Sequence, residues 1–195
     1  MEISKLKDQG VIIRTKNASL AIDPLIVDNS LPADAAECDF ILLTTPEQTL
    51  EKFGENKRLF SWPGEYEVQG VAVHAYPTNG YDNEHRSNLF FVIYTGEGKL
   101  CYLPPLNKEI SANVMEAIGD VDLLIFPAGG EEKLWHSTLE SIEPKAVLPL
   151  PVEGGLSIDS LFVKIGIPKP QSAPKLVFKN KNDFPAENMA AFLLD

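Results

Sequence analysis

One stretch of the chain indicates its fold: Asp39-Phe-Ile-Leu-Leu-Thr-Thr-Pro-Glu-Gln-Thr-Leu50. Its first part, Phe40 to Leu43, is a continuous apolar run, which is typical of a central strand covered on both faces. The residues from Thr44 onward form a polar connection, and Thr49 to Phe53 fits a short helix that ends at Gly54. The segment therefore predicts a buried strand that leads through a loop into a helix.

The chain on either side of this strand predicts two mixed sheets. Strands are expected where short apolar or alternating runs are bounded by Gly, Pro or Asn, and residues 25–37 are expected to form a loop. The predicted strands cover Val11–Lys16, Ser19–Asp23, Arg58–Trp62, Tyr66–Val68, Val71–Tyr76, Asn88–Tyr94, Lys99–Leu103, Val121–Phe126, Ala146–Leu150, Lys175–Phe178 and Ala190–Leu194. Helices are predicted at Ile110–Ile118, Leu134–Ile142 and Ile158–Ile165. Hairpins come first and helices then alternate with strands, which favours packed sheets with helices on the outer faces of one domain, residues 1–195.

Composition excludes several classes of partner. Of the 195 residues, 44% are hydrophobic and 23% charged, as in ordinary globular domains. The net charge of −11 argues against nucleic acid and anionic membranes, which are themselves polyanions. No apolar stretch reaches the roughly 18 residues of a membrane span, and the first ten residues do not resemble a signal peptide. Cys38 and Cys101 lack metal-site spacing and indicate reduced cysteines, so a cytoplasmic protein is expected.

Six short motifs, in order along nearly the whole chain, resemble the L-ascorbate-6-phosphate-lactonase-like branch of the metallo-β-lactamase superfamily. The most distinctive of them is Pro-Gly-Glu-Tyr-Glu-Val at residues 63–68. The resemblance implies an αββα sandwich, in which two mixed sheets lie face to face between outer helices. The six motifs are Ala21–Pro24, Asp39–Thr44, Trp62–Gly70, Arg86–Asn88, Asp120–Ile125 and Ile142–Pro149.

The resemblance also implies that the metal ligands of this superfamily are replaced. Active relatives carry Thr-His-x-His-x-Asp-His where this chain has Thr44-Thr-Pro-Glu-Gln-Thr-Leu50. A mid-chain histidine would fall near Thr78 to Tyr81, a Gly-Asp turn corresponds to Pro104-Pro105, and a late histidine corresponds to Pro151. A catalytic zinc site needs at least three His, Asp, Glu or Cys ligands. We therefore expect no metal and no cofactor, and a vestigial pocket formed by Thr45, Glu47, Thr49, Leu50, Tyr81, Asp82, His85, Arg86, Pro105 and Pro151.

Several polar residues allow more than one interpretation. Glu47 is either a helix-capping carboxylate or a remaining metal ligand or general base. His85 lies in a polar loop with Asp82 and Glu84 that is either solvated or able to hold a metal or substrate. His74 and His136 favour structural positions in a strand and a helix. Asp23 is expected to brace the loop that follows it through backbone hydrogen bonds.

Three functions are compatible with these observations. The first is a metal-free, catalytically inactive protein that acts as a binding or assembly module. The second is a divergent hydrolase of the lactone or phosphoester class, either rebuilt around Glu47, Asp82 and His85 or independent of metal. The third is a structural protein whose pocket is filled by side chains. The apolar segment Met189–Asp195 further suggests a homo-oligomer, because an exposed apolar strand would otherwise aggregate.

Overall fold

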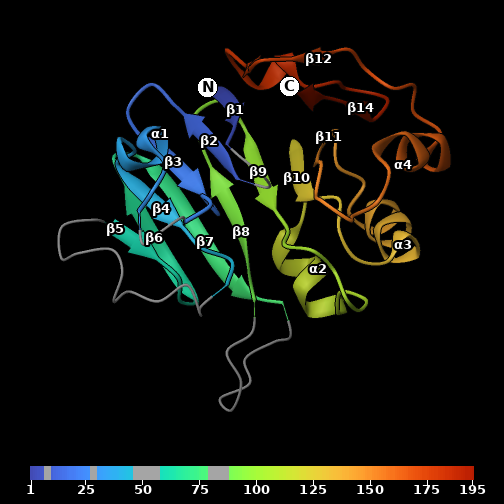
Figure 1. Ribbon diagram of the computed structural model, residues 1–195, viewed down its shortest axis with the longest axis horizontal. Helices are drawn as coiled ribbons and strands as arrows, with labels where there is room; N and C mark the ends of the chain where they lie inside the picture. Colours follow the sequence, from blue (N-terminus) through green and yellow to red (C-terminus); the bar gives the residue numbers. More distant parts are fainter. Residues whose placement is uncertain (7–9, 27–29, 46–57, 79–87) are drawn as a thin grey trace.

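Two β-sheets stack face to face in the computed structural model, which describes residues 1–6, 10–26, 30–45, 58–78 and 88–195 (Figure 1). The first sheet has six strands in the described residues, in the order β13-β1-β2-β3-β4-β5. Its N-terminal strands are antiparallel, whereas β3, β4 and β5 run parallel. The strands are β1 (Glu2–Lys5), β2 (Val11–Arg14), β3 (Ser19–Ile22), β4 (Phe40–Leu42), β5 (Arg58–Phe60) and β13 (Leu176–Val177).

The second sheet has seven strands in the described residues, in the order β14-β11-β10-β9-β8-β7-β6. Strands β6 to β9 form an antiparallel meander, and β9, β10, β11 and β14 are parallel. The strands are β6 (Gly64–Val68), β7 (Val71–Pro77), β8 (Leu89–Tyr94), β9 (Lys99–Tyr102), β10 (Leu123–Pro127), β11 (Ala146–Leu150) and β14 (Ala190–Ala191). A separate short pair joins β12 (Ser172–Ala173) to β15 (Leu193–Leu194).

Helices cover the outer faces of both sheets. The longer ones gather beside β10 and β11 in Figure 1, and the short α1 lies beside the first sheet. Helix α4 begins after Ser157, whose side chain accepts a hydrogen bond from the backbone N–H of Ser160. It ends at Gly166, whose φ of 71° is a left-handed conformation that glycine adopts without strain. The helices are α1 (Ala33–Ala36), α2 (Ala112–Ile118), α3 (Glu132–Ile142), α4 (Ile158–Ile165) and the 3-10 turn η2 (Lys181–Asp183).

Three clusters of buried apolar residues lie between these layers. This arrangement of helices and sheets confirms the predicted αββα sandwich. In β4, Phe40 and Leu42 point into the cluster between the sheets, whereas Ile41 packs with Ala35 of α1 on the outer side. In β10, Leu123 faces the same inner cluster, and its neighbours on the other face pack under α2, α3 and α4. Both strands are covered on two faces, which is why their sequences are continuous apolar runs rather than alternating ones.

The sequence-based expectations differ from the structure at several places. The strands β1 and β12 and the turn η2 were not expected. Residues 25–37 were expected to form a loop, but Ala33–Ala36 forms a single helical turn. Ala190–Leu194 was expected to be one strand, but Phe192 interrupts it, so its two halves pair with different strands. The expected helix at residues 49–53 lies outside the described residues. Among the described helices, none is long and apolar enough to cross a membrane.

The apolar C-terminal residues are buried within their own chain. Leu193 and Leu194 are 7% and 5% exposed, and Phe192 packs edge-on against Phe178. The apolar side chains of the C-terminal strand are therefore covered by the protein's own core. The strand gives no reason to expect an oligomer. Self-association stays a prediction.

Candidate functional site

A cavity of about 460 Å³ lies at the edge of the sandwich where several parallel strands end. Strand β3 leads into it at Asp23, β4 at Thr44, β9 at Pro104 and β11 at Val152. The carboxyl ends of parallel strands meet at one edge of a sheet, which is the usual place for a binding site in open α/β folds. The cavity is lined by Asp23, Pro24, Leu25, Thr44, Thr45, Asn88, Pro104, Pro105, Val152 and Glu153.

This cavity contains part of the vestigial pocket that the sequence predicts. Thr45 and Pro105 line it together, although 60 residues separate them in the chain. Pro151 is exposed and directly precedes Val152, which lines the same cavity. The other predicted pocket residues lie outside the described part of the chain; they are Glu47, Thr49, Leu50, Tyr81, Asp82, His85 and Arg86.

Asp23 lines the cavity and joins the two sheets. Its carboxylate accepts hydrogen bonds of 2.7 Å from the backbone N–H and from the hydroxyl of Thr44. The hydroxyl of Tyr102, at the end of β9, also hydrogen-bonds to it. Thr44 in turn accepts a 2.7 Å bond from the backbone N–H of Leu89, at the start of β8. Asp23 therefore braces a connection 21 residues further along the chain. We had expected it to brace the loop that directly follows it, of which residues 27–29 lie outside the described ranges.

Burial raises the pKa of the Asp23 carboxyl to about 6, although the hydrogen bonds from Thr44 and Tyr102 oppose the change. Burial and the neighbouring carboxylate together raise the pKa of Tyr102 well above its ordinary value, so its hydroxyl stays protonated and can donate. Asp23 adopts a positive φ of 44°, which is uncommon for a non-glycine residue. The side-chain bonds to Thr44 account for this conformation, because they hold Asp23 in place from the neighbouring strand.

The described lining offers few metal donors. Asp23 and Glu153 are its carboxylates, and Pro104 and Pro105 have no donor atom in their side chains. Nowhere in the described residues do three or more His, Cys, Asp or Glu side chains gather in a way that could hold a metal ion. The described donor set therefore does not fit the metal site of active relatives. Glu47, Asp82 and His85 lie outside the described ranges, so the expected absence of metal stays a prediction.

Two histidines occupy structural positions away from the cavity. His74 lies on β7, where its ring nitrogen Nδ1 is 3.3 Å from the hydroxyl of Tyr76 and its ring lies 5.0 Å from that of Tyr94. His136 lies on α3, with Nδ1 3.3 Å from the carboxylate of Glu140. The structure thus places both where the sequence favoured them, in a strand and in a helix.

Sequence reasoning did not assign four polar or acidic residues to this cavity. The structure shows that it is also lined by Asp23, Thr44, Asn88 and Glu153. Two signals pointed to the last two: Asn88 ends one of the six motifs, and Glu153 lies two residues after the position that corresponds to the late histidine. Neither signal could show that these segments meet.

Comparisons with known proteins agree with this architecture. Residues 2–159 match the family model described as a β-lactamase superfamily domain. The sequence matches no curated protein. Over all of this chain and 99% of the other, the fold resembles a proposed zinc-dependent hydrolase of the metallo-β-lactamase superfamily from Thermotoga maritima, with a TM-score of 0.76 and 19% identity.

Two further solved structures share the fold at lower similarity. One is an isothiocyanate hydrolase from Delia radicum gut bacteria, with a TM-score of 0.61, 10% identity, and coverage of 84% of this chain and 91% of the other. Another is a proposed metal-dependent hydrolase from Veillonella parvula, with a TM-score of 0.63, 9% identity, and coverage of 90% and 98%. At these identities the likeness concerns the fold alone. Because the family model spans most of the chain, we conclude that this protein belongs to the β-lactamase superfamily and has the metallo-β-lactamase fold.

Proposed function

We propose that this protein is a hydrolase-like member of the metallo-β-lactamase superfamily that works without a metal and without hydrolysis, as a small-molecule binding module. The observation that carries the proposal is the chemistry of the cavity at the carboxyl ends of the strands. Thr45 and Pro105 stand in its wall where active relatives have ligands, and Pro151 directly follows β11 at the third such position. None of these side chains can replace a histidine or an aspartate as a metal ligand.

The lack of a metal would remove the usual source of the nucleophile. In this superfamily a bound metal lowers the pKa of water, so that hydroxide is available near neutral pH. Without that ion, Asp23 is the candidate base in the described lining with a raised pKa. Its carboxylate, however, already accepts hydrogen bonds from Thr44 and Tyr102. These bonds support a bracing role for Asp23 rather than proton abstraction from a substrate.

The lining indicates which ligands such a module would take. The described wall contains two carboxylates, two threonines and an asparagine, and it contains no lysine, arginine or histidine. Carboxylates repel an anionic ligand and favour a neutral polar or cationic one. We therefore expect a ligand that carries hydroxyl, amide or amine groups and fits a volume of about 460 Å³. The open cavity favours this binding role over a purely structural protein with a filled pocket.

A divergent hydrolase is the second candidate function. Glu47 follows Thr45 by two residues, and His85 precedes Asn88 by three, and both Thr45 and Asn88 line the cavity. A rebuilt site around Glu47, Asp82 and His85 would thus belong to segments that adjoin this cavity in sequence. Such an enzyme would act on lactones or phosphoesters.

The six ordered motifs support placing the protein in the L-ascorbate-6-phosphate-lactonase-like branch. The two buried free cysteines support a cytoplasmic location, since such thiols persist in reducing compartments. The net charge of −11 supports the absence of nucleic acid and membrane partners.

A hydrolysis assay separates the two functions. The purified protein is incubated with lactones, β-lactams and phosphodiesters, with and without added zinc, iron or manganese. We expect no turnover above that of a mock purification. Sustained turnover that is abolished by Glu47→Ala or His85→Ala, with the fold retained by circular dichroism, would contradict the binding module and establish the hydrolase.

A further inference from the structure

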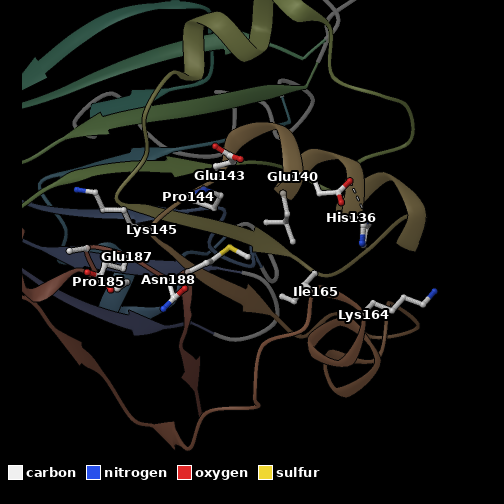
Figure 2. Close-up of a pocket in the computed structure, with 13 residues that line it drawn as sticks. His136, Glu140, Glu143, Pro144, Lys145, Lys164, Ile165, Pro185, Glu187 and Asn188 are labelled. Carbon is white, nitrogen blue, oxygen red and sulfur yellow. Dashed lines mark ion pairs between the residues drawn. The ribbon is translucent and has the colours of Figure 1, made fainter.

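A second concave surface, of about 510 Å³, lies away from the cavity described above. The end of α3 forms one wall, the end of α4 another, and residues 185–189 before β14 the third (Figure 2). Pro144 and Lys145 lie directly before β11, whereas Val152, in the first cavity, comes after that strand. The two hollows therefore lie at opposite ends of β11 and share no lining residue. We refer to the second one as the α3–α4 groove.

The floor of the α3–α4 groove is apolar. Leu139 is 3% exposed, Pro144 is buried, and Ile165 and Met189 are partly buried. Methionine is flexible and polarisable, so it adapts to apolar side chains of different shape. Such a floor provides a seat for one bulky aliphatic or aromatic side chain.

The rim of the groove carries uncompensated negative charge. Its two lysines are already paired, because Lys145 Nζ lies 2.7 Å from Asp122 and Lys164 Nζ lies 2.7 Å from Glu132. Three glutamates remain on the rim, Glu140, Glu143 and Glu187, and Figure 2 shows them around the hollow. Glu140 contacts only His136 as an ion-pair partner in the described residues, and neither of the other two forms an ion pair there.

Glu143 destabilises the C-terminal end of α3 for two reasons. It is the C-cap of α3 with φ 48° and ψ 52°, a left-handed conformation that glycine normally supplies. Its carboxylate also lies at the negative end of the α3 dipole, where the last turn contains no basic residue. A cation placed at this helix end would be attracted by Glu140, Glu143 and the free carbonyl groups together.

From this arrangement we infer that the α3–α4 groove docks a basic segment of another protein, with one apolar side chain on the floor and flanking lysines or arginines on the glutamate rim. Charge complementarity selects this occupant. A second copy of this chain fits less well, because 28 acidic residues against 17 basic ones make its surface predominantly like-charged. The inference does not depend on the function proposed for the first cavity.

Nuclear magnetic resonance on the full ¹⁵N-labelled chain tests the inference. Two pools of synthetic ten-residue peptides are titrated: a basic pool with a central Leu, Phe or Met between lysines and arginines, and a matched pool with glutamate at every basic position. We expect the basic pool to shift the amide resonances of Glu140, Lys145, Ile165 and Asn188, to bind at least about tenfold more tightly than the acidic pool, and to weaken with added salt.

Charge-neutralising variants locate the binding. The triple variant Glu140→Gln, Glu143→Gln and Glu187→Gln should weaken binding of the basic pool by about tenfold or more. The control Glu67→Gln, at an exposed position of β6 that lines neither hollow, should not change it. Urea unfolding of each variant shows that the fold is retained. The inference is wrong if both pools bind equally, if the shifts map elsewhere, if the triple variant binds normally, or if no shift occurs at roughly 1 mM peptide.

Discussion

Replacing Asp23 by asparagine should change how the stability of this protein depends on pH. Burial raises the pKa of Asp23 from 3.8 to about 6 in the folded protein. Between these two values the folded state binds the proton more strongly than the unfolded state does. The free energy of unfolding therefore falls as pH rises from about 4 to about 6 and is then constant with respect to this group. A shift of about two pH units corresponds to a fall of about 3 kcal/mol.

The Asp23→Asn variant removes this contribution because its amide stays neutral. The amide oxygen can still accept the backbone N–H of Thr44, but the amide NH₂ replaces an acceptor oxygen for the hydroxyl groups of Thr44 and Tyr102. That loss should cost about 1 kcal/mol at every pH. We therefore expect the variant to be about as stable as the native protein near pH 4.5, and more stable than it, by up to about 2 kcal/mol, near pH 8.

Urea unfolding at half-unit steps from pH 4 to 8 measures the effect as the difference between variant and native protein. Taking the difference removes the contributions of the other titrating groups to the pH dependence of stability. One such group is Asp39, whose pKa is lowered by hydrogen bonds from the backbone N–H and hydroxyl of Ser19. Asp39→Asn is the matched control: the pKa of Asp39 is lowered from 3.8, so its stabilisation is lost only below about pH 4, and its difference curve should be nearly flat over this range. A curve for Asp23→Asn that is as flat as that of the control would refute this description of Asp23.

Three further predictions concern metal, packing and assembly. The melting temperature should be the same in EDTA and in added zinc, because an ion bound only to the folded state would raise it by mass action; a fall of several degrees in EDTA that zinc reverses would reveal a hidden site. Asp122→Ala should lower the free energy of unfolding at pH 7 by about 2–3 kcal/mol, because Asp122 accepts hydrogen bonds from the backbone N–H of Lys99 and from Nζ of Lys145. An unchanged midpoint of urea unfolding would contradict this role. Light scattering at micromolar concentration tests the expected homo-oligomer, whose interface would have to lie outside the buried C-terminal strand, and a mass of one chain at all concentrations would exclude one.

The fold could be predicted where the sequence pattern depends on local burial. Phe40–Leu42 and Leu123–Pro127 are buried on both faces, so their apolar runs identified them as central strands. A single helical turn such as Ala33–Ala36 is too short to show helical periodicity, and no side chain caps its start. Phe192, at the break between β14 and β15, packs against Phe178, and no local pattern contains such a tertiary contact.

The candidate site could be predicted only in part, for the same reason. Thr45 was found because it follows the Asp39–Thr44 motif, and Pro105 because Pro104-Pro105 corresponds to the Gly-Asp turn of active relatives. The link from Asp23 to Thr44 and Tyr102 connects the ends of three strands in two sheets, and only the folded chain brings them together. The α3–α4 groove likewise combines three distant segments, in which each glutamate taken alone resembles an ordinary surface residue.

Elemental analysis of protein purified without chelator tests the central claim most directly. The native chain, Glu47→Ala and His85→Ala are prepared in parallel and measured for zinc, iron and manganese by mass spectrometry. The proposed metal-free module predicts far less than one equivalent of any of these metals in all three samples. One or more equivalents of a transition metal in the native protein, lost in either variant, would contradict it and show that a metal site persists beside the cavity.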